Sequence, residues 1–412
     1  MNLELLNKYF PRIFPLVPLA VPYWSRQTYR NILRCLVAGE LINGPDLIHL
    51  QKQLVEHFRV PDMLLCSSGS LALELALRVC DLTTRDEVII PSFCCSSVVA
   101  PILAVGATPV LADVGGELNL TVETVDAVRT RKTRAIIVPH LYGNPADIDS
   151  IAELGNTHNI VVIDDAAQAV GATIDDRPAG SCGDIGVISF GAEKVCSGLG
   201  GGALMAHSAG LVEAARQVVL GYPSRSGTLR RFTKTLVRRR WRRWTLLFER
   251  MLPLGPEKSP EALPEPYRHE QLANLDAAVA RSLIDLLPDN LTARRARVKS
   301  YGQLLGNQSG IELIDHGPGS ACLNQIVRVL PQRRSEDVTA QIISALGEAG
   351  YEVQGSYVPI HLMADFPQCV WDRLPNTEQV WSDLIELPCE PDIALEHLEH
   401  IAAIIKRIVS TR

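Results

Sequence analysis

The chain has 412 residues, of which 47% are hydrophobic and 21% are charged, and its formal net charge is −6. This length allows two domains around substantial cores, and the composition excludes a chain that is largely disordered. The 10 cysteines form no CxxC pair and have no metal-ligand spacing with histidine. We therefore expect reduced thiols in a cytoplasmic protein, with no metal site and no nucleic-acid partner.

The first 24 residues contain an apolar stretch, but Pro15, Pro18 and Pro22 interrupt it, so it fits neither a signal peptide nor a membrane anchor. The segment 88–112 carries no charged residue and is long enough to cross a bilayer. Its prolines and serines instead predict a short strand, a helix closed by Gly106 and a second strand. This pattern is typical of a βαβ unit that is covered on both faces.

The same alternation continues along the chain. Strands are predicted in 134–143, 160–172, 184–190 and 201–207, the first two running into loops, and a helix is predicted over 147–159. Strands separated by helices of about a dozen residues predict an α/β fold with a mostly parallel sheet and helices on both faces. In such a sheet the ligand lies beyond the carboxyl ends of the strands.

The residues that follow these strands are small or polar. The turn 67–70 opens a helix, and a helix amino terminus offers free N–H groups to an anion, although alone it is most often an ordinary cap. Two adjacent acids, the second of them Asp165, end a strand and are followed by Gln168. Ser189 ends the next strand, and Lys194 lies five residues beyond it.

Lys194 is isolated, because Glu193 is its only charged neighbour in the segment 188–205. Pyridoxal 5′-phosphate needs a lysine for a covalent bond, an acid beside its pyridine nitrogen and donors for its phosphate. The polar groups at the strand ends meet these needs together, and an apolar setting leaves more of an amine in its nucleophilic free-base form. The alternative is a lysine at the core edge whose ammonium group reaches solvent.

At this point the sequence resembles a known family. The DegT/StrS-like nucleotide-sugar aminotransferases of fold type I show similar motifs in the same order, over most of the chain from about Gly39 onward. The motifs that carry the resemblance are SSGSLALELAL, DEVIIPSF, GATPVLADV, HLYGNPADIDSI, IDDAAQAVGA, GSCGDIGVISF and GGALM.

The resemblance implies a role for each matching residue. Lys194 is the catalytic lysine that binds the cofactor covalently, Asp165 is the partner of the pyridine nitrogen, and Gln168 contacts the ring or its hydroxyl. The other cofactor-binding residues that it implies are Gly69, Ser70, the Leu71 backbone and Ser189 at the phosphate, and Cys95 at the ring.

The implied fold has a large domain with a mostly parallel, seven-stranded sheet and a smaller α+β carboxyl-terminal domain. We expect 1–39 to pack with the small domain, 40–285 to form the large domain and 286–412 to form the small one. The implied reaction is a ping-pong transamination from an amino acid, usually glutamate, to a keto-sugar nucleotide in amino-sugar and polysaccharide biosynthesis. The implied assembly is a homodimer with a shared active site.

Two departures from the family pattern stand out. Where the family has an aromatic residue stacked over the cofactor ring, this chain has Cys95, and Phe93 lies two residues earlier. A thiol offers less contact area than an aromatic ring, so we expect weaker cofactor retention or an altered substrate fit. The family's asparagine that reaches the partner subunit's phosphate is also missing, and Arg268 and His269 are the candidates to replace it.

A basic island interrupts the resemblance within an insertion at about 222–265. Between Arg225 and Arg250 there are ten lysines or arginines and one acid. The apolar residues of 229–252 fall mainly at helical spacing, which predicts an amphipathic helix. Such a helix either lies in an anionic membrane interface, at the inner face of the membrane, or docks on the protein itself.

Two functions therefore remain open. The first is a pyridoxal 5′-phosphate-dependent sugar aminotransferase, which the retained Lys194, Asp165 and Gln168 favour. The second is a non-catalytic or regulatory descendant of that scaffold with an altered cofactor site, which the two departures favour.

Overall fold

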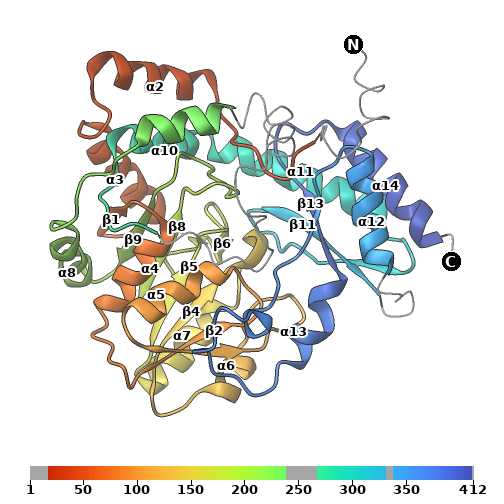
Figure 1. Cartoon of the computed structure of the whole chain (residues 1–412), viewed down its shortest axis with the longest axis horizontal. Coiled ribbons are helices and arrows are strands. Elements are labelled where there is room, and N and C mark those ends of the chain that lie inside the picture. Colours follow the sequence, from red (N-terminus) through yellow and green to blue (C-terminus); the bar gives the residue numbers. More distant parts are fainter. Residues whose placement is uncertain (1–16, 238–266, 331–336, 411–412) are drawn as a thin grey trace.

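The computed structural model describes residues 17–237, 267–330 and 337–410, and it contains one large and one small sheet (Figure 1). The large sheet has seven strands in the order β1-β9-β8-β5-β4-β2-β3. Within it only β9 runs antiparallel to its neighbours, so the predicted α/β fold with a mostly parallel sheet is confirmed. Its strands are β1 (Asp62–Cys66), β2 (Glu87–Pro91), β3 (Thr108–Ala112), β4 (Thr133–Pro139), β5 (Val161–Asp165), β8 (Ile185–Ser189) and β9 (Gly202–Ala206).

Helices cover both faces of the large sheet. On one face α4, α5 and α8 share an apolar cluster with the strands. On the other face α3 and α10, with α2 outside them, cover the β1 end, and α6 and α7 cover the β3 end (Figure 1). These helices are α2 (Arg26–Ala38), α3 (Asp46–Phe58), α4 (Gly69–Arg78), α5 (Val99–Ala104), α6 (Val122–Val128), α7 (Ile148–His158), α8 (Ala209–Val219) and α10 (Asn274–Asp285).

The central strand β4 shows why the strands are apolar throughout. Successive side chains of a strand point to opposite faces of the sheet. Ala135 and Ile137 accordingly belong to the cluster with α4, whereas Ile136 and Val138 belong to the cluster with α7. All four are fully buried, so neither face of this strand can carry a polar pattern, as expected for a parallel sheet covered twice.

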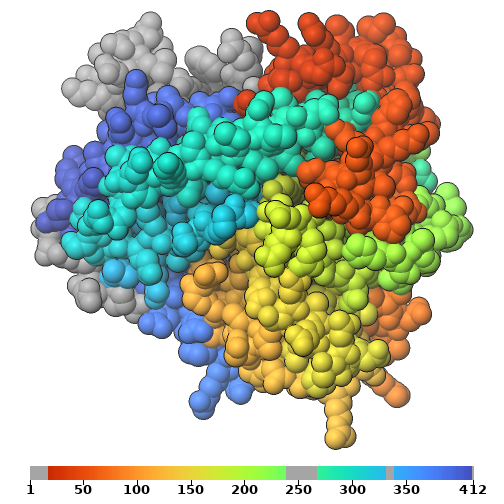
Figure 2. All heavy atoms as spheres, turned by 180° about the vertical axis from the view of Figure 1, so that it is seen from behind, coloured from red at the N-terminus to blue at the C-terminus, as the bar shows by residue number. Residues whose placement is uncertain are grey.

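The small sheet is antiparallel, with the order β10-β11-β13-β12. Seen from behind, residues 274–305 form a continuous band from the amino-terminal helices to the blue carboxyl-terminal part (Figure 2). The elements of this part are β10 (Ile311–Leu313), β11 (Asn324–Val329), β12 (Gln354–Gly355), β13 (Leu384–Pro388), α11 (Leu287–Leu305), α12 (Asp337–Glu348), α13 (Pro375–Val380) and α14 (Leu395–Ser410), and the short pair β6 (Thr173–Ile174) and β7 (Arg177–Pro178) lies apart from it.

Two segments cross between the large and the small sheet. Val17 forms a bridge with Tyr351 beside the small sheet, whereas α2, a little further along, packs against α10 of the large domain. After β12, the chain returns to the large sheet, where Asp113 accepts hydrogen bonds from the amides of Asn376 and Thr377. The predicted domain boundaries at 39 and 285 stay predictions.

The described part of the basic island lies on the body of the protein. A helix begins at Thr228 and is described as far as Val237, so most of the predicted helix over 229–252 lies outside the described residues. Phe232 stacks on Trp24 with ring centroids 6.5 Å apart. Among the described residues, no helix combines the length and apolar composition that crossing a bilayer requires.

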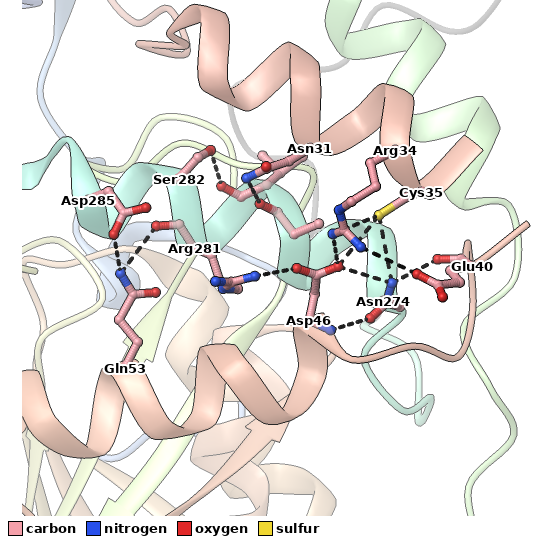
Figure 3. A network of polar contacts seen from close by, with 12 residues as sticks. Asn31, Arg34, Cys35, Glu40, Asp46, Gln53, Asn274, Arg281, Ser282 and Asp285 are labelled. Atoms are coloured by element: carbon pink, nitrogen blue, oxygen red, sulfur yellow. Dashed lines mark hydrogen bonds and ion pairs between the residues drawn. The ribbon is translucent and has the colours of Figure 1, made fainter. Parts of the chain in front are cut away.

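A buried carboxylate joins three helices at the top of the large domain (Figure 3). Asp46, the first residue of α3, is fully buried and accepts hydrogen bonds from Arg34 of α2 and Arg281 of α10. Asn274 accepts from the Asp46 amide at 2.8 Å and donates to the Glu40 carbonyl at 2.8 Å. Burial pushes the pKa of Asp46 upward, but the two arginines outweigh that effect, so the pKa lies below its usual value.

We predict that Asp46→Ala lowers the free energy of unfolding by about 3 kcal/mol, because the change leaves two partly buried guanidinium groups without their anion. Chemical denaturation followed by circular dichroism measures the change. Glu56→Ala, an exposed acid on the same helix, is the matched control and should change the value by less than about 0.5 kcal/mol. Equal effects of the two variants would contradict the prediction.

Candidate functional site

A cavity of about 370 Å³ lies at the carboxyl ends of the large sheet's parallel strands, between that sheet and the small one. Seven of the eight predicted site residues line it, although they come from widely separated segments. They are Gly69, Ser70, Cys95, Asp165, Gln168, Ser189 and Lys194. The small sheet and the chain around it contribute the opposite wall, with Asn324, Glu352, Gln354, Tyr357 and Glu386.

The amino terminus of α4 points into the cavity. Ser68 caps the helix by accepting a hydrogen bond from the Leu71 amide at 3.1 Å. Leu71 is the one predicted site residue that does not line the cavity, and its amide is already used by the cap. The amides of Gly69 and Ser70 have no acceptor within the helix and are available to an anion.

Ser189 lies directly against this helix terminus. A Cβ atom on Gly69 would come within 2.9 Å of the Ser189 Cβ, so only glycine allows the strand end and the helix to approach this closely. The Ser189 Oγ accepts a hydrogen bond from the Gly191 amide at 3.2 Å. Its hydroxyl hydrogen is therefore free to point at a ligand, beside the two helix amides.

The two adjacent acids at the end of β5 have different surroundings. Asp164 is fully buried on the far face, where it accepts hydrogen bonds from His140 Nε2 at 2.7 Å and the Cys182 amide at 2.8 Å. The Ala146 amide donates to His140 Nδ1, so the proton of that ring lies on Nε2. Asp165 faces the cavity instead, as strand alternation requires.

Asp165 is 4% exposed, and one of its oxygens accepts the Ala167 amide at 3.0 Å. Burial raises the pKa of Asp165 above its usual value, and the Ala167 amide and the positive charge of Lys194 partly oppose that rise. A cationic group bound beside this carboxyl would favour its charged form further.

Gln168 presents its nitrogen to the cavity. Its Oε1 accepts the Tyr142 amide at 3.0 Å, so the NH2 group is the part that remains for a ligand. Tyr142 has a φ of 56° and is buried, and its hydroxyl bonds to Ser356 of the opposite wall. This tyrosine therefore connects the two walls of the cavity.

Lys194 lies on the loop after β8, directly after Glu193, whose φ of 65° is in the left-handed region. That conformation costs free energy in a residue other than glycine and is enriched at functional sites. Lys194 lines the cavity, and its positive charge acts on the Asp165 carboxyl.

Cys95 lines the cavity, at 3.0 Å from the Ser97 hydroxyl. Phe93 is fully buried and does not line it. The aromatic ring that does line the cavity is Tyr357, which packs edge-on against Phe93 at 6.1 Å and stacks on Tyr142 at 5.8 Å. The aromatic surface of the site thus comes from the opposite wall.

That wall also holds a buried carboxyl group. Glu386, on β13, is 3% exposed, and its Oε2 accepts hydrogen bonds from Asn324 at 3.0 Å and Gln354 at 3.2 Å. Burial raises the pKa of Glu386 to about 7, although these two amides oppose the rise.

The segment expected to replace the missing asparagine is held by Glu74, a fully buried acid of α4. Glu74 accepts hydrogen bonds from the Tyr267 hydroxyl and from His269 Nε2, the latter at 2.8 Å. His269 is therefore already engaged within the chain. The Arg268 side chain is 75% exposed and lies 3.8 Å from the Glu270 carboxylate, while its carbonyl accepts from Ser67 at 3.0 Å. Of the two candidates, Arg268 is therefore the more accessible to a ligand or another subunit.

The sequence did not single out Tyr142, Tyr357, Gln354 or Glu386. Tyr142 lies in the motif HLYGNPADIDSI, which carries part of the resemblance, and that was the signal available for it. His361 does not line the cavity, and its Nδ1 lies 2.7 Å from the Ser92 hydroxyl. Over residues 17–237, 267–330 and 337–410, no group of three or more histidines, cysteines or acids could hold a metal ion.

Comparison with known proteins identifies what this arrangement is similar to. The sequence model of the DegT/DnrJ/EryC1/StrS aminotransferase family matches residues 24–406. The GDP-perosamine synthase of Caulobacter vibrioides is 25% identical over 96% of this chain and 99% of its own length. A UDP-N-acetyl-3-dehydro-alpha-D-glucosamine 3-aminotransferase of Acidithiobacillus ferrooxidans is 43% identical over 141 residues, which are 34% of this chain and 38% of that protein.

Solved structures share the fold at lower identity. The Helicobacter pylori aminotransferase involved in pseudoaminic acid biosynthesis superposes with a TM-score of 0.80 at 18% identity, over 96% of this chain and 99% of that one. An aminotransferase from Streptoalloteichus hindustanus superposes with a TM-score of 0.78 at 22% identity, over 96% and 99%. These likenesses confirm the predicted fold.

We predict that the stability of this site depends on pH through Glu386. Its pKa rises from 4.5 in the unfolded chain to about 7 in the folded protein, so the folded state binds the proton more tightly. Stability is then fully present below about pH 4.5 and is lost as the pH rises toward about 7, by up to about 3 kcal/mol. Glu386→Gln cannot ionise and should escape this loss.

Thermal unfolding at about pH 5 and about pH 8 checks this. At each pH, the melting temperature of Glu386→Gln is compared with that of the unchanged protein. The difference in favour of the variant should be distinctly larger at about pH 8 than at about pH 5. Glu312→Gln, a change at an acid of β10 whose side chain is 53% exposed, is the control. A difference between Glu386→Gln and the unchanged protein that is the same at both pH values would refute the raised pKa.

Proposed function

The chain belongs to the DegT/DnrJ/EryC1/StrS aminotransferase family, and from this premise we propose that it transfers an amino group from an amino acid to a keto-sugar nucleotide, using pyridoxal 5′-phosphate. The observation that carries the proposal is the meeting of three groups at one cavity: the isolated Lys194, the buried Asp165 and the amino terminus of α4. A sugar nucleotide as acceptor agrees with the names of the relatives, which include synthases and aminotransferases of nucleotide sugars.

The residues at the cavity fit the cofactor. The phosphate would be held by the amides of Gly69 and Ser70 and by the hydroxyl of Ser189. The two amides have no acceptor within the helix, and the hydroxyl has a hydrogen that no other group uses. A Cβ atom on Gly69 would fill this cradle. The ring would lie beside Asp165, whose buried carboxyl gains from a cationic neighbour, and Gln168 would donate from its amide nitrogen.

When bound, pyridoxal 5′-phosphate supplies an electron sink that stabilises negative charge at the Cα atom of the substrate. Lys194 would hold the cofactor covalently between turnovers and would move the proton from the donor's Cα once the substrate amine displaces it. Asp165 would keep the pyridine nitrogen protonated. Burial of the site between the two sheets would exclude water from these groups.

Two further features belong to the proposal. The donor we propose from the resemblance is glutamate, and the assembly is a homodimer whose active site both subunits share. The exposed Arg268, on the segment held by Glu74, is the side chain that would reach the neighbouring subunit. We place the reaction in the cytoplasm.

We predict that the purified protein, saturated with pyridoxal 5′-phosphate, shows an absorbance band near ~420 nm that is absent in Lys194→Ala, because only the covalent bond to this lysine produces it. Glutamate should shift the band in the unchanged protein. Absorbance spectroscopy measures both effects.

Lys52→Ala, a change at an exposed lysine of α3, is the control for the loss of one positive charge and should keep the band. If the unchanged protein shows no band at saturating cofactor, the result contradicts the proposed enzymatic function and favours the non-catalytic alternative. Retention of the band in Lys194→Ala would assign the covalent bond to another lysine.

For the basic island, we propose that the described part of its helix belongs to the protein body rather than to a membrane interface. Arg225 and Arg231 both bind the carboxylate of Asp276, at 3.0 and 3.1 Å, and that residue is 1% exposed. Phe232 adds the stacking contact with Trp24. These contacts engage two basic side chains and one aromatic ring of the described part, so these three are not available to a membrane surface.

Asp276→Ala should therefore lower the melting temperature, while salt-sensitive sedimentation with anionic liposomes should be absent from the unchanged protein. Asp285→Ala, at an acid of the same helix that is more exposed, serves as the control for stability. Liposome binding that is lost on deletion of 229–252 would instead support the membrane interface, the other alternative for this helix.

A further inference from the structure

The wall of the cavity opposite Lys194 carries a carboxyl group that the proposed transfer does not use. Glu386 is 3% exposed and lines the cavity, and Asn324 and Gln354 both donate to its Oε2 atom. The Tyr142 hydroxyl also interacts with this carboxyl and partly opposes the rise of its pKa. Two side-chain amides on neighbouring strands of the small sheet thus set the orientation of this carboxyl.

The charged and titratable groups around Glu386 are mostly acidic. Glu193, on the loop of the catalytic lysine, is close enough for its charge to raise the pKa of Glu386. Tyr142 and Tyr357 face it from the other elements, and burial keeps the pKa values of both phenols well above the usual value. The other charged residues in the described lining of the cavity are Glu352, Asp165 and Lys194.

A carboxyl group has opposite hydrogen-bonding properties in its two protonation states. Ionised, it only accepts hydrogen bonds and repels a second carboxylate, whereas protonated it also donates one. An ionised Glu386 therefore suits a carboxamide NH2 group, and a protonated Glu386 suits a carboxylate. A pKa of about 7 puts both states within the range of ordinary cell conditions.

We infer that Glu386 is the residue that selects the amino donor, favouring glutamine when it is ionised and admitting glutamate when it is protonated. This inference rests on the proposed function. The reacting amine must lie at Lys194, on the large-sheet side, so the rest of a bound amino acid extends toward the opposite wall. Glu386 lies on that wall, so we place the end of the donor's side chain beside it, where glutamate carries a carboxylate and glutamine a neutral amide.

The test measures the half-reaction of the holoenzyme with each donor. Apparent dissociation constants for L-glutamate and L-glutamine come from the change in the cofactor absorbance between about pH 6 and about pH 8. For glutamate the constant should rise roughly tenfold over this range, as Glu386 loses its proton. For glutamine it should change by less than about twofold or fall.

Glu386→Gln has the same shape and cannot ionise, so its glutamate constant should be nearly independent of pH. At about pH 8 it should bind glutamate roughly tenfold more tightly than the unchanged protein does. A damaged fold would not produce this gain of affinity. Glu312→Gln, outside the cavity, is the matched control and should behave as the unchanged protein.

A second variant shifts the pH at which glutamate binding weakens, whereas Glu386→Gln removes the pH dependence altogether. Gln354→Leu deletes one donor to the ionised carboxyl, which raises the pKa of Glu386 further. The pH at which glutamate binding weakens should therefore shift upward. The same upward shift should appear in the pH dependence of the melting temperature, which does not depend on the cofactor.

The outcomes separate the two proposals. If the cofactor band forms but neither donor changes it, the proposed transfer fails and the donor selection fails with it. If both donors react but Glu386→Gln keeps the pH dependence of glutamate binding, only the assignment of Glu386 is overturned. If that dependence disappears while the glutamine constant stays constant, the assignment holds.

Discussion

The parallel register of β4, β5 and β8 brings Asp165, Gln168, Ser189 and Lys194 to one edge of the large sheet. Pro139 pairs with Asp165, and Asp165 pairs with Val187, two residues before Ser189. Because the three strands end together, the groups that follow them meet at one edge. The glycine at position 69 completes this arrangement, since a side chain there would collide with Ser189. A shift of β5 by one residue would turn Asp165 away from the cavity and Asp164 toward it.

Three buried acids connect elements of the fold, and they differ in their hydrogen-bond partners. Asp46 has two arginines, and its pKa falls below the usual value despite burial. Asp164 has a histidine and an amide on the far face of the sheet. Glu386 has only neutral donors, so burial dominates and its pKa rises to about 7. Asp46 thus serves as a charged anchor, whereas Glu386, at the cavity, is left able to change its charge.

The sequence predicted the sheet and its reactive edge because both depend on local patterns: apolar strands, a cap, and polar residues at strand ends. The opposite wall could not be predicted in this way. Glu386 lies about 190 residues from Lys194 in the sequence, in an apolar strand that reads as ordinary core, and it reaches the cavity only because the small sheet packs there. The Leu71 backbone was predicted to bind the phosphate, but the Ser68 hydroxyl already accepts the hydrogen bond of the Leu71 amide. A sequence motif does not show which of the two acceptors an amide will bind. Asp165 and Asp164 could be distinguished only once the strand's faces were known.

The loss of an aromatic residue at Cys95 is best understood together with that opposite wall. Tyr357 supplies the ring that lines the cavity, and it is held between Phe93 and Tyr142. Phe93 therefore acts on the site through Tyr357 rather than by direct contact. Tyr142 in turn connects Gln168 of the large-sheet side with Ser356 near β12. This aromatic packing ties the two walls together, so the positions of the reactive side and of the opposite side depend on the same three rings.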